Sequence, residues 1–283
     1  LEGEEEILLD ENDLAKNHAY FALGSIQISP DNKLLAFATD TVSRRVYTIR
    51  FKNLETNELL PDVLENASPG GAWALDNQTF FYTTKNTTSL LSEKVWRHTL
   101  GSATADEMVY HEKDPSYYIG VYASKSKEYV IIYNSSTLIS DYHILPANEP
   151  NGTFKQFIPR AEKEHEYSIY HLDDKFYILT NWKAQNFRLM QVDAANTAKE
   201  NWKEILPHRE DVLLEGIDLF SKHLVVSERS NALSKIRVIN NATKDDYYID
   251  FAEPAYVAYT GTNKDFNSNK LRFIYSSLTT PTS

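Results

Sequence analysis

Short hydrophobic runs recur along the chain at an almost constant spacing, and each run follows a polar turn. They begin at Leu34 (LLAFAT), Thr79 (TFFYTT), Tyr129 (YVIIYN), Lys175 (KFYILTN), Lys222 (KHLVVSER) and Leu271 (LRFIYSS). A second set of strand-like segments follows with the same period, starting at Val46, Val95, Asp141, Asn186 and Lys235. A period of about 45–50 residues, with every unit made of short strands, is typical of a β-propeller that has one four-stranded blade per repeat.

The turn clusters between these segments place five whole repeats at about 26–61, 71–112, 117–159, 165–207 and 212–251. Residues 5–10 (EEILLD) are expected to be a strand of a broken first blade, and the segments from Tyr256 and Leu271 the first half of a last one. We therefore predict an all-β fold, an incomplete propeller ring of five whole blades plus partial first and last blades. It would form a single domain over residues 1–283, a fragment of a longer protein that self-associates through exposed strand edges. One short helix is expected near residues 12–20, capped by Asn12 or Asp13.

Composition and charge argue against some classes of binding partner. The chain is 42% hydrophobic and 24% charged, which is ordinary for a globular protein. No apolar run approaches the roughly 18 residues that a membrane span needs, so no membrane partner is predicted. The net charge of −11 argues against nucleic-acid binding and allows basic ligands. The absence of cysteine excludes disulfides and thiolate chemistry.

The motifs of several enzyme classes are missing from this sequence. It contains no G-x-S-x-G, no H-E-x-x-H, no phosphate-binding loop and no dinucleotide fingerprint. His165-Glu166 resembles the start of a zinc motif, but the next histidine is His171, six residues on. We therefore predict no catalytic residue, no cofactor and no metal site within the chain.

Two short segments are candidates for function through their position. Arg44 and Arg45 lie in a loop between two predicted strands, where paired guanidiniums could hold a carboxylate, or could be solvated or form a local ion pair. Glu215 lies on the first strand of a repeat, which lines the central channel of a propeller, and Gly216 beside it would allow close approach of another backbone. The four tryptophans are expected in the core: Trp73, Trp96, Trp182 and Trp202.

Several runs of the sequence resemble the propeller domain of oligopeptidase B, the trypsin-like branch of the prolyl oligopeptidase family. These runs are SPDNKLLAFATDTVSRRVYTIRFKNLET, KVWRHTLG, EYSIYHLDDKFYILTN, NFRLM, PHREDVLLEGIDLF, LVVSER and YSSLTTPTS. They cover nearly the whole chain in order. The resemblance implies a seven-bladed propeller that caps an α/β-hydrolase domain with a Ser-Asp-His triad, in a cytoplasmic enzyme that cleaves short peptides after Arg or Lys.

The resemblance also implies roles for the domain and for some of its residues. The propeller would gate substrates, and it would be inactive alone because the triad lies in the hydrolase domain. Its partners would be that hydrolase domain and short basic peptides. Arg45 matches an arginine at the boundary between the two domains, although the acidic partner found in several members near residue 19 is Ala19 here. The alternative is a stand-alone propeller that binds a protein or peptide.

Overall fold

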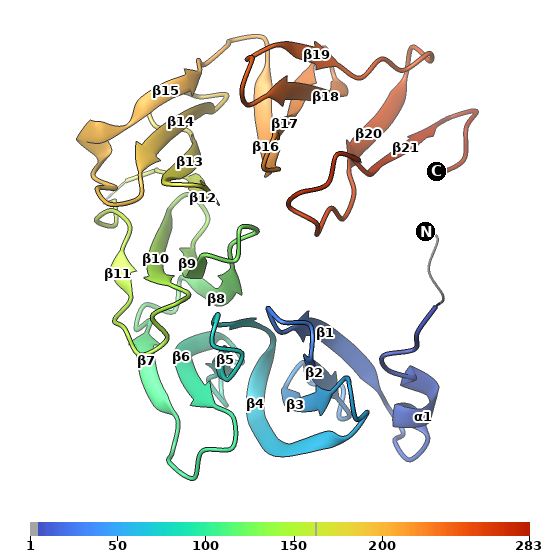
Figure 1. Cartoon of the computed structure of the whole chain (residues 1–283). Helices are drawn as coiled ribbons and strands as arrows, with labels where there is room; N and C mark the ends of the chain where they lie inside the picture. The colour runs from blue at the N-terminus through green and yellow to red at the C-terminus, as the bar shows by residue number, and fades with distance from the viewer. Residues whose placement is uncertain (1–4, 162) are drawn as a thin grey trace. The chain divides into compact units, whose positions relative to one another are not determined.

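Antiparallel strands joined by short turns make up most of the computed structural model, which describes residues 5–161 and 163–283 (Figure 1). The residues fall into two compact units. One unit contains residues 1–136 and 142–156, and the other contains residues 137–141 and 157–283. Across the described residues, no helix has both the length and the apolar character needed to cross a membrane.

The first described segment differs from the prediction. Residues 5–10 form no strand, so the expected strand of a broken first blade is wrong. They lead into the short helix α1 (Glu11–Ala15), whose N-cap is Asp10. Oδ1 of Asp10 accepts the backbone N–H groups of Asn12 at 2.9 Å and Asp13 at 3.2 Å. The cap is neither of the two predicted residues, because the helix begins before both of them.

A seven-stranded antiparallel sheet dominates the first unit. Its strands follow in chain order, each paired with the next: β1 (Ala22–Ile28), β2 (Leu34–Asp40), β3 (Tyr47–Asn53), β4 (Leu59–Trp73), β5 (Thr79–Lys85), β6 (Ser92–Thr99) and β7 (Glu107–His111).

The predicted boundary between the first two repeats lies inside one continuous strand. β4 has 15 residues; its first half pairs with β3 and its second half with β5. The pairing with β5 shifts between Ala67 and Gly71. Such a bulge bends a strand, so one strand serves two repeats where the sequence suggested a break between about residues 61 and 71.

The later repeats are separate sheets, as predicted. One has the order β11-β10-β9-β8, with bounds β8 (Tyr118–Ala123), β9 (Tyr129–Ser135), β10 (Ser140–Pro146) and β11 (Lys155–Gln156). The next contains β12 (Tyr167–Leu172), β13 (Lys175–Thr180), β14 (Arg188–Asp193) and β15 (Lys203–Leu206), with a 3₁₀ turn, η1 (Lys199–Asn201), before its last strand.

The last two sheets belong to the second unit. One contains β16 (Leu213–Leu219), β17 (His223–Ser230), β18 (Leu233–Asn240) and β19 (Asp246–Tyr248), and the other only β20 (Tyr256–Thr260) and β21 (Phe273–Ser277). The predicted repeating strands and the two-stranded start of a last repeat are confirmed. The expected self-association through strand edges stays a prediction.

The inner strands are apolar on consecutive residues because both of their faces are covered. Phe80 and Phe81 of β5 point to opposite sides of the sheet, and both are buried. The Phe80 ring lies 5.4 Å from Phe51 and 5.0 Å from Trp73 (centroid distances). The Phe81 ring packs in a different cluster, 5.4 Å from Phe154. Uninterrupted runs such as TFFYTT are therefore central strands of this fold.

The four tryptophans divide into two groups. Trp73 and Trp202 are buried, which confirms the core position predicted for them. Trp96 is partly buried but packs against the core cluster that contains Trp73, in agreement with the prediction. Trp182 is only partly buried in the loop between β13 and β14, so the prediction of a core position is wrong for this residue.

One buried histidine joins the two halves of the seven-stranded sheet. Nδ1 of His98, on β6, lies 2.8 Å from a carboxylate oxygen of Asp106, and Nε2 lies 3.1 Å from one of Asp62, on β4. The hydroxyl of Tyr82 donates to the other oxygen of Asp106 at 2.7 Å. Asp62 keeps only 8% of its side chain exposed, and its Oδ1 also accepts the backbone N–H of Gly101 at 2.8 Å.

The chain segment after β21 is held by one carboxylate and by backbone hydrogen bonds between Tyr275 and Ser283. Glu253 accepts hydrogen bonds from the hydroxyls of Ser277 (2.6 Å), Thr279 (2.5 Å), Thr280 (2.5 Å) and Tyr275 (3.2 Å). These bonds, that of Ser277 first, lower the pKa of Glu253 to about 2. The carboxylate fixes this turn through neutral donors instead of an ion pair.

We expect His98→Leu to lower the free energy of unfolding by about 3 kcal/mol, because two largely buried carboxylate groups lose a hydrogen-bond partner. Urea unfolding measures the change. His18→Leu is the control, since His18 is exposed in the loop after α1. Equal unfolding free energies for the two variants would contradict this role of His98.

Candidate functional site

The arginine loop, residues 41–45, is organised by one buried carboxylate. Asp40 ends β2 and is almost fully buried. Its Oδ1 accepts the backbone N–H of Val42 at 2.9 Å, and its Oδ2 accepts that of Arg45 at 2.7 Å. Burial would raise the pKa of Asp40, but these bonds and those from the N–H groups of Arg44 and Ser43 outweigh it and lower the pKa. The loop therefore wraps around a permanent negative charge.

The two arginine side chains of this loop are exposed. Arg45 has a φ of 54°, a conformation that non-glycine residues rarely adopt and that the bond to Asp40 supports. Neither Arg44 nor Arg45 forms an ion pair with any residue in the described part of the chain. The sequence allowed either solvated arginine side chains or a local ion pair in this loop. The structure shows the solvated side chains.

A third positive charge lies next to the loop. Nζ of Lys85, at the end of β5, donates to the backbone carbonyl of Arg45 at 2.5 Å. Burial lowers the pKa of Lys85, the charge of Arg45 lowers it further, and Asp40 acts in the opposite direction. Arg44, Arg45 and Lys85 thus form a cationic surface that could hold an external carboxylate bidentately.

The other candidate, Glu215, lies in the second unit and already has a partner. It is the extra residue of a bulge in β16, because the pairing with β17 shifts between Leu214 and Gly216. Its Oε1 accepts from Nε of Arg229 at 2.6 Å. The close backbone approach expected at Gly216 is wrong: among the described residues, no neighbouring heavy atom lies within 4 Å of the Cβ position that a larger residue would occupy there.

Sequence reasoning missed Asp40 and Lys85. An aspartate directly after an apolar strand and before a short polar loop is a signal for side-chain hydrogen bonds to the loop backbone, and it could have identified Asp40. Lys85 carries no comparable signal, because it comes from a different strand and meets the loop only through packing. Ala19, where an acidic partner of Arg45 was considered, is exposed and has no polar side chain.

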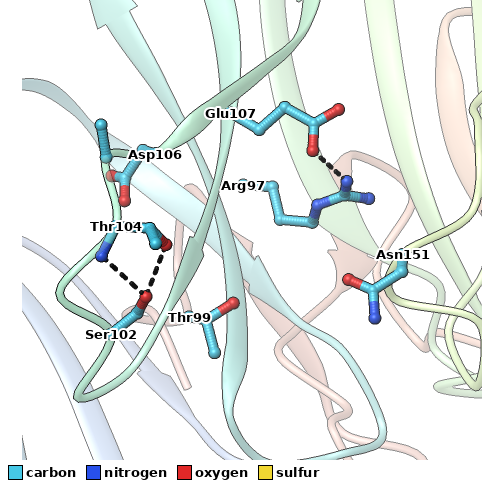
Figure 2. Close-up of a pocket in the computed structure, with 8 residues that line it drawn as sticks. Arg97, Thr99, Ser102, Thr104, Asp106, Glu107 and Asn151 are labelled. Atoms are coloured by element: carbon cyan, nitrogen blue, oxygen red, sulfur yellow. Dashed lines mark hydrogen bonds and ion pairs between the residues drawn. The ribbon is translucent and has the colours of Figure 1, made fainter.

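A polar pocket of about 210 Å³ lies at the turn between β6 and β7 (Figure 2). Arg97 forms an ion pair with Glu107 and donates to the carbonyls of residues 150 (2.8 Å) and 152 (3.3 Å). The hydroxyls of Ser102 and Thr104 bond each other at 2.7 Å. The ionic groups of the pocket are compensated within the protein, so the pocket is a weaker candidate than the arginine loop. Nowhere in residues 5–161 and 163–283 do three His, Asp or Glu side chains gather as metal ligands.

The family model described as "Prolyl oligopeptidase, N-terminal beta-propeller domain" matches residues 1–283. Dipeptidyl aminopeptidase BI of Pseudoxanthomonas mexicana is 42% identical over 98% of this chain and 38% of its own length. Protease 2 of Moraxella lacunata is 28% identical over 98% of this chain and 40% of its own. The structure of oligopeptidase B from Leishmania major superposes with a TM-score of 0.90 at 26% identity, covering 98% of this chain and 40% of that one. The chain thus spans 38–40% of the length of these proteins.

We expect Asp40→Ala to lower the free energy of unfolding by about 2 kcal/mol, because backbone N–H groups of the loop lose a buried acceptor. Because the pKa of Asp40 is lowered in the folded state, this contribution is present in full above its ordinary pKa of 3.8 and is lost as the pH falls further. Urea unfolding at pH 7 and at lower pH measures both effects. Asp174→Ala, at an exposed hairpin, is the control; a loss no larger than in that control would rule out the organising role of Asp40.

Proposed function

Because the chain belongs to the prolyl oligopeptidase family and forms its N-terminal β-propeller, we propose that it is the substrate-gating domain of a serine peptidase that acts on short peptides. The observation that carries the proposal is the family match over residues 1–283. In homologues the propeller packs against the catalytic α/β-hydrolase domain. That domain would supply the Ser-Asp-His triad, so the chain by itself is inactive. A cytoplasmic location is a further expectation from the sequence. The alternative function is a stand-alone propeller that binds a protein or peptide, and the peptidase relatives favour the enzyme domain over this alternative.

The arginine loop is the part of the propeller that we assign to the contact with the catalytic domain. Arg44 and Arg45 are exposed and unpaired among the described residues, and Lys85 adds to their charge. Their complement is a carboxylate on the facing domain, because guanidinium and carboxylate groups form paired hydrogen bonds. Breaking and forming this contact would open and close the path for substrate, a common use of lids. Glu215 is the weaker candidate, because Arg229 already occupies it.

Two bond specificities are supported by different observations. Cleavage after Arg or Lys is favoured by the similarity to oligopeptidase B and Protease 2. The net charge of −11 would also raise the local concentration of basic peptides. Release of dipeptides from the N-terminus of a peptide is the second candidate, and the 42% identity to Dipeptidyl aminopeptidase BI favours it.

Two peptides separate these specificities when the whole protein that contains this chain is assayed by mass spectrometry. One peptide has a blocked N-terminus and a single internal Arg; the other has a free N-terminus and neither Arg nor Lys. We expect cleavage of the first after Arg. Loss of dipeptides from the peptide with the free N-terminus, without cleavage of the blocked peptide, would support the release of dipeptides. Cleavage of neither peptide, without labelling by a serine-reactive phosphonate, would contradict the peptidase proposal itself.

The gate is tested by Arg44→Ala/Arg45→Ala in the whole protein. We expect kcat/KM for a short peptide to fall about tenfold, equivalent to about 1.4 kcal/mol, because the closed arrangement loses its docking contact. Arg50→Ala is the matched control, since Arg50 is an exposed arginine of β3 in the same sheet. Equal kcat/KM values for the double variant and the control would remove the arginine loop from the gate.

A further inference from the structure

Three cationic side chains surround one indole ring in the second unit. The Trp182 ring centre lies 4.8 Å from Nζ of Lys183, 5.2 Å from Cζ of Arg188 and 5.6 Å from Nζ of Lys199. Trp182 and Lys183 belong to the loop between β13 and β14, Arg188 begins β14, and Lys199 begins η1. Four residues from three consecutive elements of one repeat thus meet at one place.

The cluster contains many hydrogen-bond donors and few acceptors. Nη1 of Arg188 bonds to Glu204 at 3.0 Å, but its Nε is buried and has no hydrogen-bond partner. Neither Lys183 nor Lys199 has a carboxylate partner within the part of the chain that the structure describes. The indole N–H of Trp182 likewise lacks an acceptor there, in contrast to that of Trp202, which donates to a backbone carbonyl at 3.0 Å.

Lys199 is held in place without its charge being neutralised. Its Nζ lies 3.3 Å from Nδ1 of His165 and 5.8 Å from the centre of the Trp202 ring. Burial and then the charge of Lys199 lower the pKa of His165 to about 4, so this imidazole is neutral at pH 7 and accepts one ammonium N–H. Burial also lowers the pKa of Lys199. Two of its three N–H bonds remain for another acceptor.

The loop that carries Trp182 and Lys183 is fixed in advance. The N–H of Trp182 donates to the hydroxyl of Thr180 at 3.0 Å, and the side-chain oxygen of Asn181 accepts the N–H of Glu166 at 2.9 Å. Lys183 has a φ of 52°, where asparagine or glycine would be less strained. A lysine in a conformation that disfavours it is a reason to look for a function of its side chain.

We propose that Trp182, Lys183, Arg188 and Lys199 form a binding site for a small oxyanion, either a carboxylate or a phosphate. Contact with the indole face satisfies none of the N–H groups of these three cations. An oxyanion satisfies several donors at once and compensates the positive charge, and charge-assisted bonds of this kind are the strong ones. The site lies in a different unit from the arginine loop and does not depend on the proposed peptidase function.

The test is thermal unfolding of the 283-residue chain in sodium phosphate, sodium acetate or sodium chloride at equal pH and ionic strength. We expect phosphate or acetate to raise Tm by about 2–4 °C over chloride, because a ligand that binds only the folded state stabilises it. A response to acetate alone identifies a carboxylate ligand, and a response to phosphate alone a phosphate ligand. Lys199→Met should abolish the rise, whereas Lys264→Met, which removes an exposed lysine elsewhere in the same unit, should leave it unchanged.

Lys183→Ser is the second variant, because its side chain is exposed and its loss should not impair folding. Titration of the tryptophan fluorescence with the active anion should show binding at least threefold weaker in this variant than in the unchanged chain. Two results would overturn the proposal: no rise of Tm beyond that in chloride, or an equal response in Lys183→Ser and the unchanged chain.

Discussion

Burial of the inner strands on both faces is the constraint on which the rest of this structure depends. A strand alternates its side chains between two faces, so a strand covered on both sides needs apolar residues in succession. β5 meets this need with Phe80 and Phe81, whose rings pack in separate clusters. Because such strands carry the core, the functional candidates lie in loops, on an edge strand or at the ends of strands.

Two carboxylates each organise a loop or turn of the backbone around them. Asp40 shapes the arginine loop through backbone N–H groups, and Glu253 fixes the turn after β21 through hydroxyls. In both cases the acid bonds to neutral donors, and its pKa is lowered. Neutral donors leave nearby cations free. Arg44 and Arg45 can therefore remain unpaired although they adjoin a carboxylate.

In a chain of net charge −11, cationic side chains gather in the arginine loop of one unit and around Trp182 in the other. The arginine loop is exposed and prearranged by its backbone, which suits contact with a large facing surface. The cluster around Trp182 is partly buried and lies beside neutral His165, which suits a small ligand. Removing a charged group partly from water costs free energy unless the group gains a hydrogen-bond partner. The cluster around Trp182 therefore requires a partner more than the exposed arginine loop does.

The sequence by itself determined the repeating strands and turns, because alternation and apolar runs are local properties of consecutive residues; the strand expected at residues 5–10 was the exception. It located the arginine loop between two strands for the same reason. It did not show that β4 is continuous, since a bulge between Ala67 and Gly71 can bend a strand that the turn-like residues seemed to end.

Only the tertiary structure decided which distant side chains meet. It placed Lys85 against the loop of Arg45, paired Glu215 with Arg229 across a bulge, and brought Lys199 to Trp182. Partners of this kind follow from strand register and packing. A shift of a single residue in register would turn each side chain to the other face, and no local pattern along the chain encodes that choice.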